Sequence, residues 1–530
     1  MPYSLYIADL DKVSLGDIDQ VGGKNASLGE MLQNLTPLGI QVPMGFVITV
    51  AAYREFLKYN KLDDAIKEII TGIKIDDIES LRRGGLQARQ LLKNAKFPRE
   101  LSEEIINKYY ELSKIYGQDA TDVAVRSSAT AEDLPDASFA GQQETYLNVR
   151  GPAPLMNAVR NCFASIFTDR AISYRESFGY DHFSIGLSVC VQKMVRSDLG
   201  ASGVAFSLDT ESGFKNVVVI NASFGLGEMI VQGSVSPDEY IVFKPTLKEN
   251  FSPIIEKKLG VKDKMMVYGD DPDERVKIIP TEKSLRERFC LTDETILKLS
   301  KWVQQIEEYY TTKKQKWTPM DVEWAIDGLS KDLFIVQARP ETIHSQKNHR
   351  IITEYKINDT KRADKIILKG IAVGDKIASG KVNILYSLDK RLTEGQVFNE
   401  GDVLVTDMTD PDWEPIMKKA SAIITNKGGR TCHAAIVARE LGVPAIVGTH
   451  HGTDELNDGQ LVTVSCGEGD EGIVYSGAIE FKKEEYNLDD LPEVKTALML
   501  NVASPSMAFN FSHLPNKGVG LAREEFIINN

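Results

Sequence analysis

Cysteine is scarce in this 530-residue sequence, and its spacing argues against two common uses of the residue. The five cysteines are scattered along the chain, and no two of them form a CxxC pair. This arrangement favours neither a disulfide framework nor a structural zinc site, and it fits a reducing compartment. We therefore expect a cytoplasmic protein without structural disulfides.

Long apolar runs and an excess of positive charge are also missing. No apolar stretch approaches the roughly 18 residues that a membrane-spanning helix needs, and the N-terminus does not read as a signal peptide. The chain carries 62 basic and 76 acidic residues, a net charge of −14. Such an acidic chain does not suit nucleic acid or an anionic membrane as its main partner. Any phosphate-binding site must therefore be local.

The length of the chain and its 42% hydrophobic residues predict several packed domains. Over residues 1–345, helix-like stretches alternate with short β-branched runs, which indicates a large α/β unit with two lobes. Residues 367–480 form a run of strands and turns around one helix, which indicates a smaller α/β domain. The polar stretches 346–366 and 481–496 read as linkers, and a new strand-led unit begins in residues 497–530.

One histidine, His433, stands where a glycine-rich turn becomes a helix. Apolar residues at helical spacing follow it, and Gly442 and Pro444 end the pattern. The first turn of a helix suits an anion such as a phosphoryl group, although the dipole contributes only about 0.3–1 kcal/mol. The neighbouring donors Arg430 and Thr431 must add to it. The alternative is a histidine that merely begins a helix.

Cys432, directly before that histidine, also has two readings. It could be a nucleophile in the same electropositive turn. The turn could equally require only a small side chain, and we favour this second reading.

Two carboxylates alternate along a strand-like stretch near residue 322. Asp321 and Glu323 point to one face of that strand, and a turn and a second strand predict an antiparallel hairpin with loop 328–332. In this register Glu323 lies opposite Gln337, and Asp321 lies opposite Arg339. The oxygens on this face suit Mg²⁺, and the guanidinium suits a phosphate. The alternative is a solvated sheet face with one ion pair.

Two segments nearer the N-terminus offer groups for a polyphosphate. Lys24 follows two glycines that allow the backbone to approach a ligand closely. Arg126 precedes Ser127, Ser128 and Thr130, so a guanidinium and three hydroxyls lie within five residues. Taken alone, each segment can also be a surface lysine or a polar helix cap.

Together and in order, these segments closely resemble the phosphoenolpyruvate synthase (pyruvate, water dikinase) family of PEP-utilising enzymes. The resemblance rests on Gly22-Gly23-Lys24-Asn25, on Val125-Arg126-Ser127-Ser128-Ala129, on the Asp321–Arg339 hairpin and on Gly428-Gly429-Arg430-Thr431-Cys432-His433. It implies an α/β multidomain protein, with an ATP-grasp nucleotide-binding domain and a small swivelling phosphohistidine domain. The start of a TIM barrel for pyruvate and phosphoenolpyruvate would follow.

The same resemblance implies roles for individual residues. His433 would be the phosphohistidine nucleophile, with Arg339, Thr431 and Arg430 assisting. The residues that would contact ATP are Lys24, Arg126, Arg170, Gln192, Met194, Val195, Asp321, Glu323 and Gln337. Mg²⁺ would be held by Glu323, Gln337 and Asp321, and Arg523 would bind the substrate phosphate in the barrel.

The implied reaction proceeds through a covalent intermediate. His433 would attack the β-phosphorus of ATP and release AMP, water would remove the outer phosphate, and the remaining phosphoryl group would pass to pyruvate. A TIM barrel needs about 250 residues, far more than follow residue 497. The expectation is therefore that this chain performs only the ATP half of the reaction.

Other readings stay open at this point. Pyruvate phosphate dikinase would use phosphate instead of water as acceptor, and Cys432 before the histidine disfavours it. A related antibiotic phosphotransferase would need a drug-binding domain where only residues 346–366 lie. A non-catalytic or split-enzyme subunit, associating with a second copy or with a separate barrel chain, belongs to another functional class.

Overall fold

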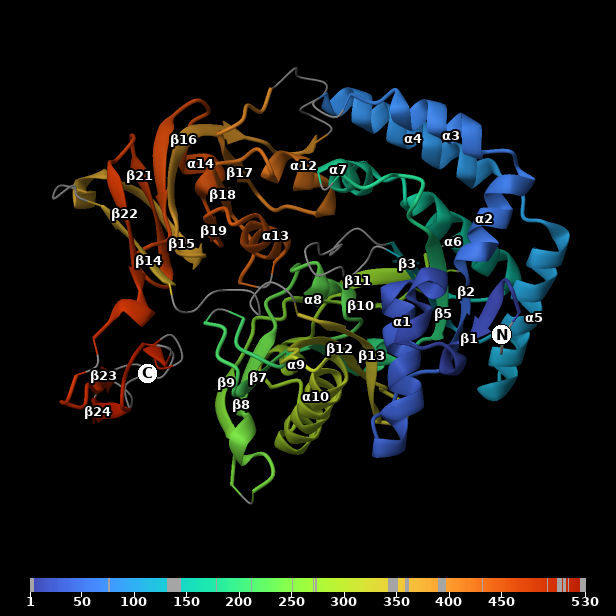
Figure 1. The fold of residues 1–530 in the computed structure, drawn as a ribbon, viewed down its shortest axis with the longest axis horizontal. Helices are drawn as coiled ribbons and strands as arrows, with labels where there is room; N and C mark the ends of the chain where they lie inside the picture. The colour runs from blue at the N-terminus through green and yellow to red at the C-terminus, as the bar shows by residue number, and fades with distance from the viewer. Residues whose placement is uncertain are drawn as a thin grey trace.

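The computed structural model describes most of the chain and divides it into two large parts and two smaller pieces (Figure 1). The described residues are 4–74, 77–130, 144–177, 179–210, 212–249, 251–269, 271, 274–341, 351–357, 362–388, 397–430, 432–492, 494–502, 508, 511–512 and 514–524. Within these ranges, no helix combines the length and the apolar character that crossing a membrane requires.

The first lobe of the larger part is an antiparallel sheet covered by helices. Its strands, in spatial order, are β1 (Ile7–Asp9), β2 (Gly45–Ile48), β5 (Leu187–Lys193), β3 (Val123–Ala129) and β4 (Thr145–Val149). The helices are α2 (Val50–Tyr59), α3 (Asp63–Thr71), α4 (Ile78–Asn94), α5 (Arg99–Ile115), α6 (Pro152–Ser165) and α7 (Asp169–Ser177). Phe56 and Phe163 pack at the centre of its core, with ring centroids 5.3 Å apart.

The second lobe is a six-stranded antiparallel sheet. Its strands are β13 (Leu333–Pro340), β12 (Met320–Ile326), β6 (Ala201–Phe206), β7 (Val217–Phe224), β8 (Asp238–Phe243) and β9 (Ile254–Lys258). The hairpin of β10 (Lys264–Tyr268) and β11 (Val276–Pro280) lies beside it, with the short helices α8 (Glu228–Val231) and α9 (Lys283–Arg286) and the long helix α10 (Asp293–Lys314).

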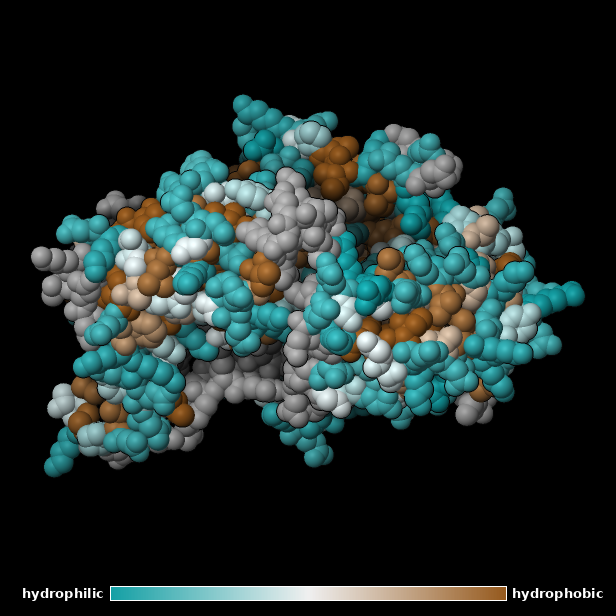
Figure 2. All heavy atoms as spheres, turned by 90° about the horizontal axis from the view of Figure 1, so that it is seen from above, coloured by the Kyte–Doolittle hydropathy of each residue, from teal (hydrophilic) through white to brown (hydrophobic). Residues whose placement is uncertain are grey.

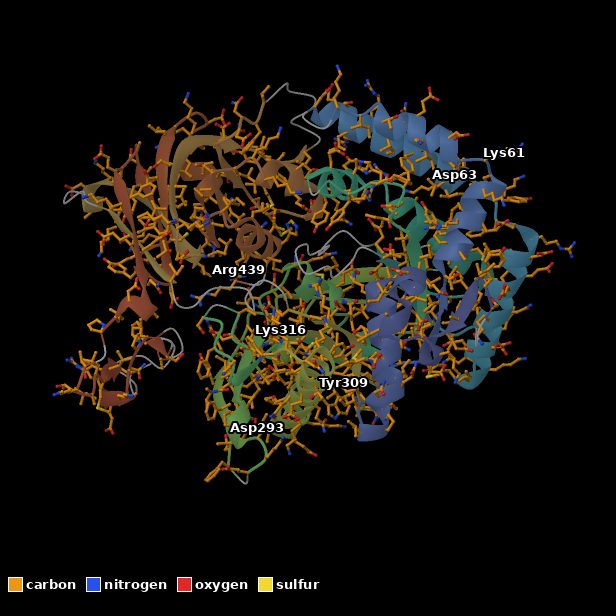
Figure 3. The ribbon with its side chains drawn as sticks, in the orientation of Figure 1. Lys61, Asp63, Asp293, Tyr309, Lys316 and Arg439 are labelled. Atoms are coloured by element: carbon orange, nitrogen blue, oxygen red, sulfur yellow. The ribbon has the colours of Figure 1, made fainter. Side chains whose placement is uncertain are left out.

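Helix α1 (Ile18–Asn34) joins the two lobes, because it contacts β3 and β5 of the first sheet and β13 of the second. Its apolar side chains share one core with α10 and the buried face of β12, where Trp324 is 1% exposed. Polar contacts add to this packing. Tyr309, labelled in Figure 3, and Lys313 lie on α10, and both contact the buried carboxylate of Glu30 on α1.

The second part is a closed seven-stranded barrel. Its strands, in order around the barrel, are β15 (Ile366–Val373), β19 (Ala445–Val447), β18 (Ala422–Thr425), β17 (Val403–Thr406), β16 (Ile377–Ile384), β20 (Leu461–Ser465) and β21 (Glu471–Ser476). Helices α12 (Glu414–Met417), α13 (His433–Leu441) and α14 (Gly452–Glu455) accompany it. The run from β16 through β17 and β18 to β19 is parallel, so the carboxyl ends of these strands meet at one edge.

The segments expected to be linkers contain regular structure. Strand β14 (Ile351–Ile357) pairs with β22 (Phe481–Asn487) over seven antiparallel residue pairs. Charged pairs such as Lys356 with Glu484 line this ribbon, at 2.9 Å. The polar composition hid the two strands because neither has a wide apolar face. The chain therefore enters and leaves the barrel through one two-stranded ribbon.

Beyond the ribbon, β23 (Leu500–Val502) and β24 (Val519–Ala522) form a short parallel pair. The side chains of Val519 and Leu521 are about half exposed. A parallel pair agrees with the expected start of an α/β barrel, which itself stays a prediction. The face of the molecule drawn in Figure 2 is mostly hydrophilic, with separate apolar patches.

Candidate active site

The two N-terminal segments singled out in the sequence lie against each other. Gly22 has φ +75° and interrupts the regular helical geometry of α1. A Cβ at this position would lie 2.3 Å from Oγ of Ser128 and 2.8 Å from its backbone. Only glycine permits this approach. Lys24, in the first turn after the kink, is thereby brought beside the strand that carries Arg126.

The predicted register of the β12–β13 hairpin is confirmed. Asp321 pairs with Arg339, and Glu323 pairs with Gln337. The connecting loop differs from the expected 328–332, because Ile326 already pairs with Leu333. A bulge at Val336 takes up the extra residue and restores the pairing beyond it.

Arg126 reaches this bulge from the first lobe. Its Nη1 donates to the carbonyl of Val336 at 3.4 Å and lies 3.8 Å from Oε2 of Glu323. Its Nε is buried and has no hydrogen-bond partner among the described residues. A buried guanidinium nitrogen without a partner is costly, so a ligand oxygen would be a favourable addition here.

The carboxylates of the hairpin already have partners. Arg339 holds Asp321 at 2.9 Å, and the Gln337 amide donates to Oε1 of Glu323 at 3.3 Å. Within the described ranges, no group of three or more His, Cys, Asp or Glu side chains suits a metal. Two carboxylates and an amide are nevertheless hard oxygen donors of the kind that Mg²⁺ takes with waters and phosphates. The carboxamide of Gln337 has an oxygen as well as an NH₂ group, and rotation of the amide presents that oxygen here.

Arg170, on α7, lies at the edge of the same region. It is 7% exposed, and its Nη2 lies 3.4 Å from Oε1 of Glu144. Like Arg126, it has a buried Nε without a hydrogen-bond partner among the described residues. Glu228, the first residue of α8, lies near the same charges: burial and Glu144 raise its pKa, and Arg126 opposes this effect.

Three residues expected to contact ATP, Gln192, Met194 and Val195, lie at the end of β5 or just after it. Gln192 is buried and donates to the carbonyl of Pro43 at 3.2 Å. Met194 belongs to an apolar cluster with Val204 and Met229, on the sheet face that also carries Glu323. Val195 is buried beside it. The structure thus brings this segment to the sheet face that carries Glu323.

The helix predicted after the glycine-rich turn is α13, and His433 is its first residue. Gly442 ends it with φ +63°, the left-handed conformation expected there. The turn leaves β18 at the edge where the parallel strands end. Such edges are the usual ligand sites of parallel sheets.

The imidazole of His433 is held from one side. Its Nδ1 lies 3.0 Å from Oγ1 of Thr409, which follows the neighbouring parallel strand β17. Burial, followed by the positive charge of Arg170, lowers the pKa of His433 to about 4. At neutral pH the ring is therefore uncharged, and its Nε2 lies on the side away from Thr409.

Direct contacts seat the barrel on the two-lobed part of the chain, to which Arg170 belongs. Helix α7 contacts α12 directly, and the two lie side by side in Figure 1. The ammonium of Lys418 sits 5.4 Å from the ring centroid of Tyr174. Nearby, the pKa of Asp410 is raised by burial.

The other predicted residues of this turn and of the C-terminal segment stand as follows. Arg430 donates to Asp470 at 2.7 Å and also acts electrostatically on Glu239 of β8. Thr431 lies outside the described residues. The thiol of Cys432 has a raised pKa because it is buried, which supports its reading as a small packed side chain. Arg523 is exposed beyond β24, remote in sequence from the rest of the site.

Sequence reasoning missed two residues of this site, Thr409 and Glu144. A signal existed for Thr409, since it comes three residues after a predicted strand that is parallel to the one before His433. Nothing in the sequence ties Glu144 to Arg170, because that contact depends on the packing of α7.

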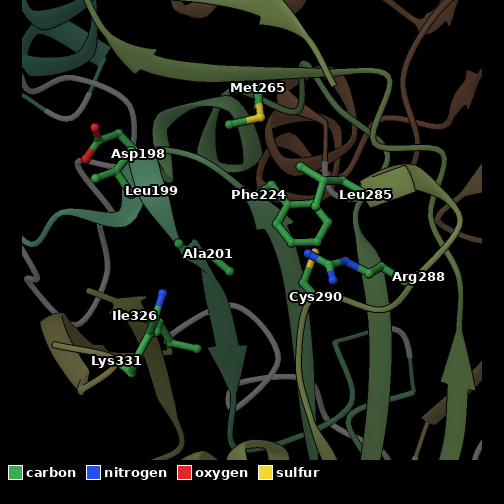
Figure 4. A pocket seen from close by; sticks show the side chains of 11 residues that line it. Asp198, Leu199, Ala201, Phe224, Met265, Leu285, Arg288, Cys290, Ile326 and Lys331 are labelled. Atoms are coloured by element: carbon green, nitrogen blue, oxygen red, sulfur yellow. The ribbon is translucent and has the colours of Figure 1, made fainter. Parts of the chain in front are cut away.

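A separate cavity of about 370 Å³ lies elsewhere in the second lobe (Figure 4). Ala201, Phe224 and Ile326 line it, together with Arg288 and Lys331. Ile326 points to the opposite face of the sheet from Glu323, because side chains alternate along β12. This cavity is therefore distinct from the site around Arg126 and His433.

Comparison with known families places the chain. A model described as "Pyruvate phosphate dikinase, AMP/ATP-binding domain" matches residues 18–359, and "PEP-utilising enzyme, mobile domain" matches residues 398–469. The chain belongs to the pyruvate phosphate dikinase AMP/ATP-binding domain family, and it also carries the mobile domain of PEP-utilising enzymes. The α/β multidomain architecture expected from the sequence agrees with both.

Its relatives carry one name. The chain is 58% identical to the phosphoenolpyruvate synthase of Aquifex aeolicus over 98% of its length, 50% identical to that of Synechocystis over 98%, and 49% identical to that of Escherichia coli over 98%. It spans 60%, 63% and 64% of these relatives, respectively. The family resemblance seen in the sequence is thereby confirmed. An NMR structure of Enzyme I matches 14% of the chain at 37% identity with a TM-score of 0.13, which is too low to bear on the fold.

Proposed function

We propose that this protein acts as a phosphoenolpyruvate synthase, converting ATP, pyruvate and water to AMP, phosphoenolpyruvate and phosphate through a phosphohistidine at His433. The names of its relatives support this reading. The observation that carries it is the packing of the barrel that bears His433 on the nucleotide-binding lobes, through α12 and α7, which brings the imidazole within the electrostatic reach of Arg170. A neutral imidazole next to a fixed cation is suited to attack a polyphosphate.

In the first step, Nε2 of His433 forms a bond to the β-phosphorus of ATP. The bond from that phosphorus to the α,β-bridging oxygen breaks, and AMP leaves with the oxygen. Nδ1–H donates to Thr409, which selects the tautomer with a free lone pair on Nε2. Water then attacks the γ-phosphorus and releases phosphate, and the remaining β-phosphoryl group stays on His433 for transfer to pyruvate.

The fixed cations bind and orient the nucleotide. Arg126 and Arg170 each offer a buried Nε to phosphate oxygens, and Lys24 lies in the first turn of α1 after the kink at Gly22. Arg339 is oriented by Asp321 for the same purpose. Glu323, Gln337 and Asp321 would hold Mg²⁺, which, when bound, neutralises developing charge on the phosphates. The apolar cluster around Met194 would pack against the adenine.

The test is to incubate the chain with Mg²⁺ and ATP labelled at the β or γ position, and to map acid-labile label by mass spectrometry. We expect β-label on His433, γ-label in free phosphate, and stoichiometric AMP. His433→Gln is the matched control and should take up none. Absence of label on the unmodified chain would overturn the proposal.

The same experiment separates the nearest alternative. If γ-label leaves as pyrophosphate, and only when inorganic phosphate is added, the chain is a pyruvate phosphate dikinase. This alternative is tested because the family model that matches residues 18–359 is described as a pyruvate phosphate dikinase domain. A nucleotide-binding subunit without catalysis would bind ATP but release no AMP.

A further inference from the structure

The turn that follows α8 brings the backbone of the nucleotide-binding lobes close to the backbone of the barrel. Gly233 ends α8 in the left-handed conformation, with φ +63°. Its N–H donates to the carbonyl of Ile230 at 2.8 Å, and the next N–H, of Ser234, donates to Met229 at 2.9 Å. These two bonds fix the turn as an ordinary glycine helix end.

The outer side of this turn touches the residue before the candidate nucleophile. A Cβ built on Gly233 would lie 2.1 Å from Cα of Cys432, 2.6 Å from its Cβ and 2.9 Å from its carbonyl carbon. Two of these three atoms are backbone, so no rotation of a flexible side chain could relieve the clash. The barrel can sit where it does only because residue 233 has no side chain.

This contact is well placed to set the position of His433. Cys432 is the N-cap of α13, and His433 is the first residue of that helix. A displacement at Cys432 therefore moves the imidazole directly. Electrostatic attraction acts beside the same contact, between Glu239 on β8 and Arg430 in the turn.

We propose that Gly233 is a positioning residue: because it has no side chain, it sets how closely the turn before His433 can approach the nucleotide-binding lobes. This inference rests on the proposed function, because the distance between the His433 turn and the lobes matters only if His433 takes a phosphoryl group from ATP. Misplacement of a reacting group by about 1 Å can cost roughly 10²-fold in rate. A methyl group at residue 233 would force a displacement of that size.

The test compares two glycine-to-alanine variants with the same backbone strain. Gly117 also ends a helix, α5, with φ +63°, and a Cβ there would meet nothing within 4 Å. Gly233→Ala and Gly117→Ala should therefore lower Tm to a similar extent. We expect Gly233→Ala to slow β-label transfer from Mg·ATP to His433 by about 10²-fold, with ATP affinity kept within about twofold. Gly117→Ala should label at the unmodified rate.

A second readout needs no ATP. Diethylpyrocarbonate modifies exposed, unprotonated histidines, so its rate at His433, followed by mass spectrometry, reports whether the barrel is seated. We expect Gly233→Ala to raise this rate several-fold and Gly117→Ala to leave it unchanged. Equal rates for the two variants in both assays would overturn the inference. An unmodified chain that never takes up label would overturn the proposed function instead, while the modification rates would still decide whether Gly233 sets the seating.

Discussion

The hydroxyl of Thr409 lies 3.0 Å from Nδ1 of His433 and is the hydrogen-bond partner that the structure gives this ring. The contact joins the ends of two neighbouring parallel strands, since Thr409 follows β17 and His433 follows β18. It fixes both the rotation of the ring and the nitrogen that points away from the barrel. The edge of the barrel thus sets the orientation of the His433 ring.

Replacing Thr409 with valine keeps the shape of this buried side chain and removes its hydrogen bond. A lost bond of this kind is worth about 0.5–1.5 kcal/mol, so we expect the rate of His433 labelling by ATP to fall roughly 3- to 10-fold. ATP affinity should not change. Thr409→Ser retains the hydroxyl and should restore most of the rate; a serine variant as slow as valine would show that packing, not the bond, matters.

The rate of His433 labelling should begin to fall only at an unusually low pH. An ordinary histidine has a pKa near 6.5, whereas burial and Arg170 lower the pKa of seated His433 to about 4. The seated form therefore stays neutral and reactive between these values. We expect the initial rate of His433 labelling to hold down to about pH 5 and to fall as the pH approaches 4.

The same shift makes seating itself sensitive to pH. When the barrel moves away, His433 regains its ordinary pKa and binds a proton more readily. Seating is therefore unaffected above about pH 6.5 and weakens as the pH falls, by at most about 1.4 kcal/mol per unit until the lowered pKa is reached. Arg170→Gln should move the acid limb upward but keep it below 6.5, because burial is the larger cause. A limb at 6.5 in the unmodified chain would contradict this account.

The hairpin illustrates how far the sequence can be read. Alternation placed Asp321 and Glu323 on one face, and their partners followed from assuming a five-residue loop. The loop is in fact longer, and the pairing survives only because Val336 bulges out of the ladder. Alternation is a local property that the chain displays, whereas a bulge depends on contacts such as the one from Arg126, 210 residues away.

Contacts between the two large parts lay beyond the sequence for the same reason. Glycine and proline marked the end of α13 correctly, because helix ends are set by local backbone geometry. No pattern could show that Arg170 would face His433, or that Gly233 would touch Cys432. The ribbon of β14 and β22 was missed because β22 is polar on both faces, and because the few apolar residues of β14, such as Tyr355 and Ile357, lie in the mostly polar stretch 346–366.

Glu323→Gln tests the assignment of the hairpin face. The change removes one charge from the oxygen donors and keeps the shape of the side chain. We expect the Mg²⁺ concentration for half-maximal labelling to rise roughly 10- to 100-fold. Asp332→Asn, an exposed carboxylate at the end of the same hairpin loop, is the matched control and should behave as the unmodified chain. Equal effects of the two changes would show that Glu323 acts only through its charge and not as a specific Mg²⁺ ligand.

Tyr268 and Asp122 connect the two lobes beside Met194, one of the residues expected to contact ATP. The phenol of Tyr268, on β10, donates to Asp122 at 2.6 Å, and Lys193 holds the other carboxylate oxygen at 2.7 Å. Burial alone would raise the pKa of Asp122, but Lys193 and Tyr268 outweigh it and lower the pKa. The carboxylate therefore stabilises the fold at neutral pH, and this contribution is lost as the pH falls through the lowered value. The carbonyl of Asp122 also accepts the N–H of Met194 at 3.0 Å.

Tyr268→Phe should therefore affect both stability and nucleotide binding. Losing a hydrogen bond to a buried carboxylate costs about 1.5–3 kcal/mol, so the Tm of the nucleotide-binding lobes should fall by several degrees. ATP should also bind more weakly, because the bond holds the lobes together beside Met194. Tyr110→Phe removes an exposed phenol from α5 and should leave both quantities unchanged. If calorimetry shows lower stability but unchanged ATP affinity, the bond stabilises the fold without setting the spacing of the lobes around the nucleotide.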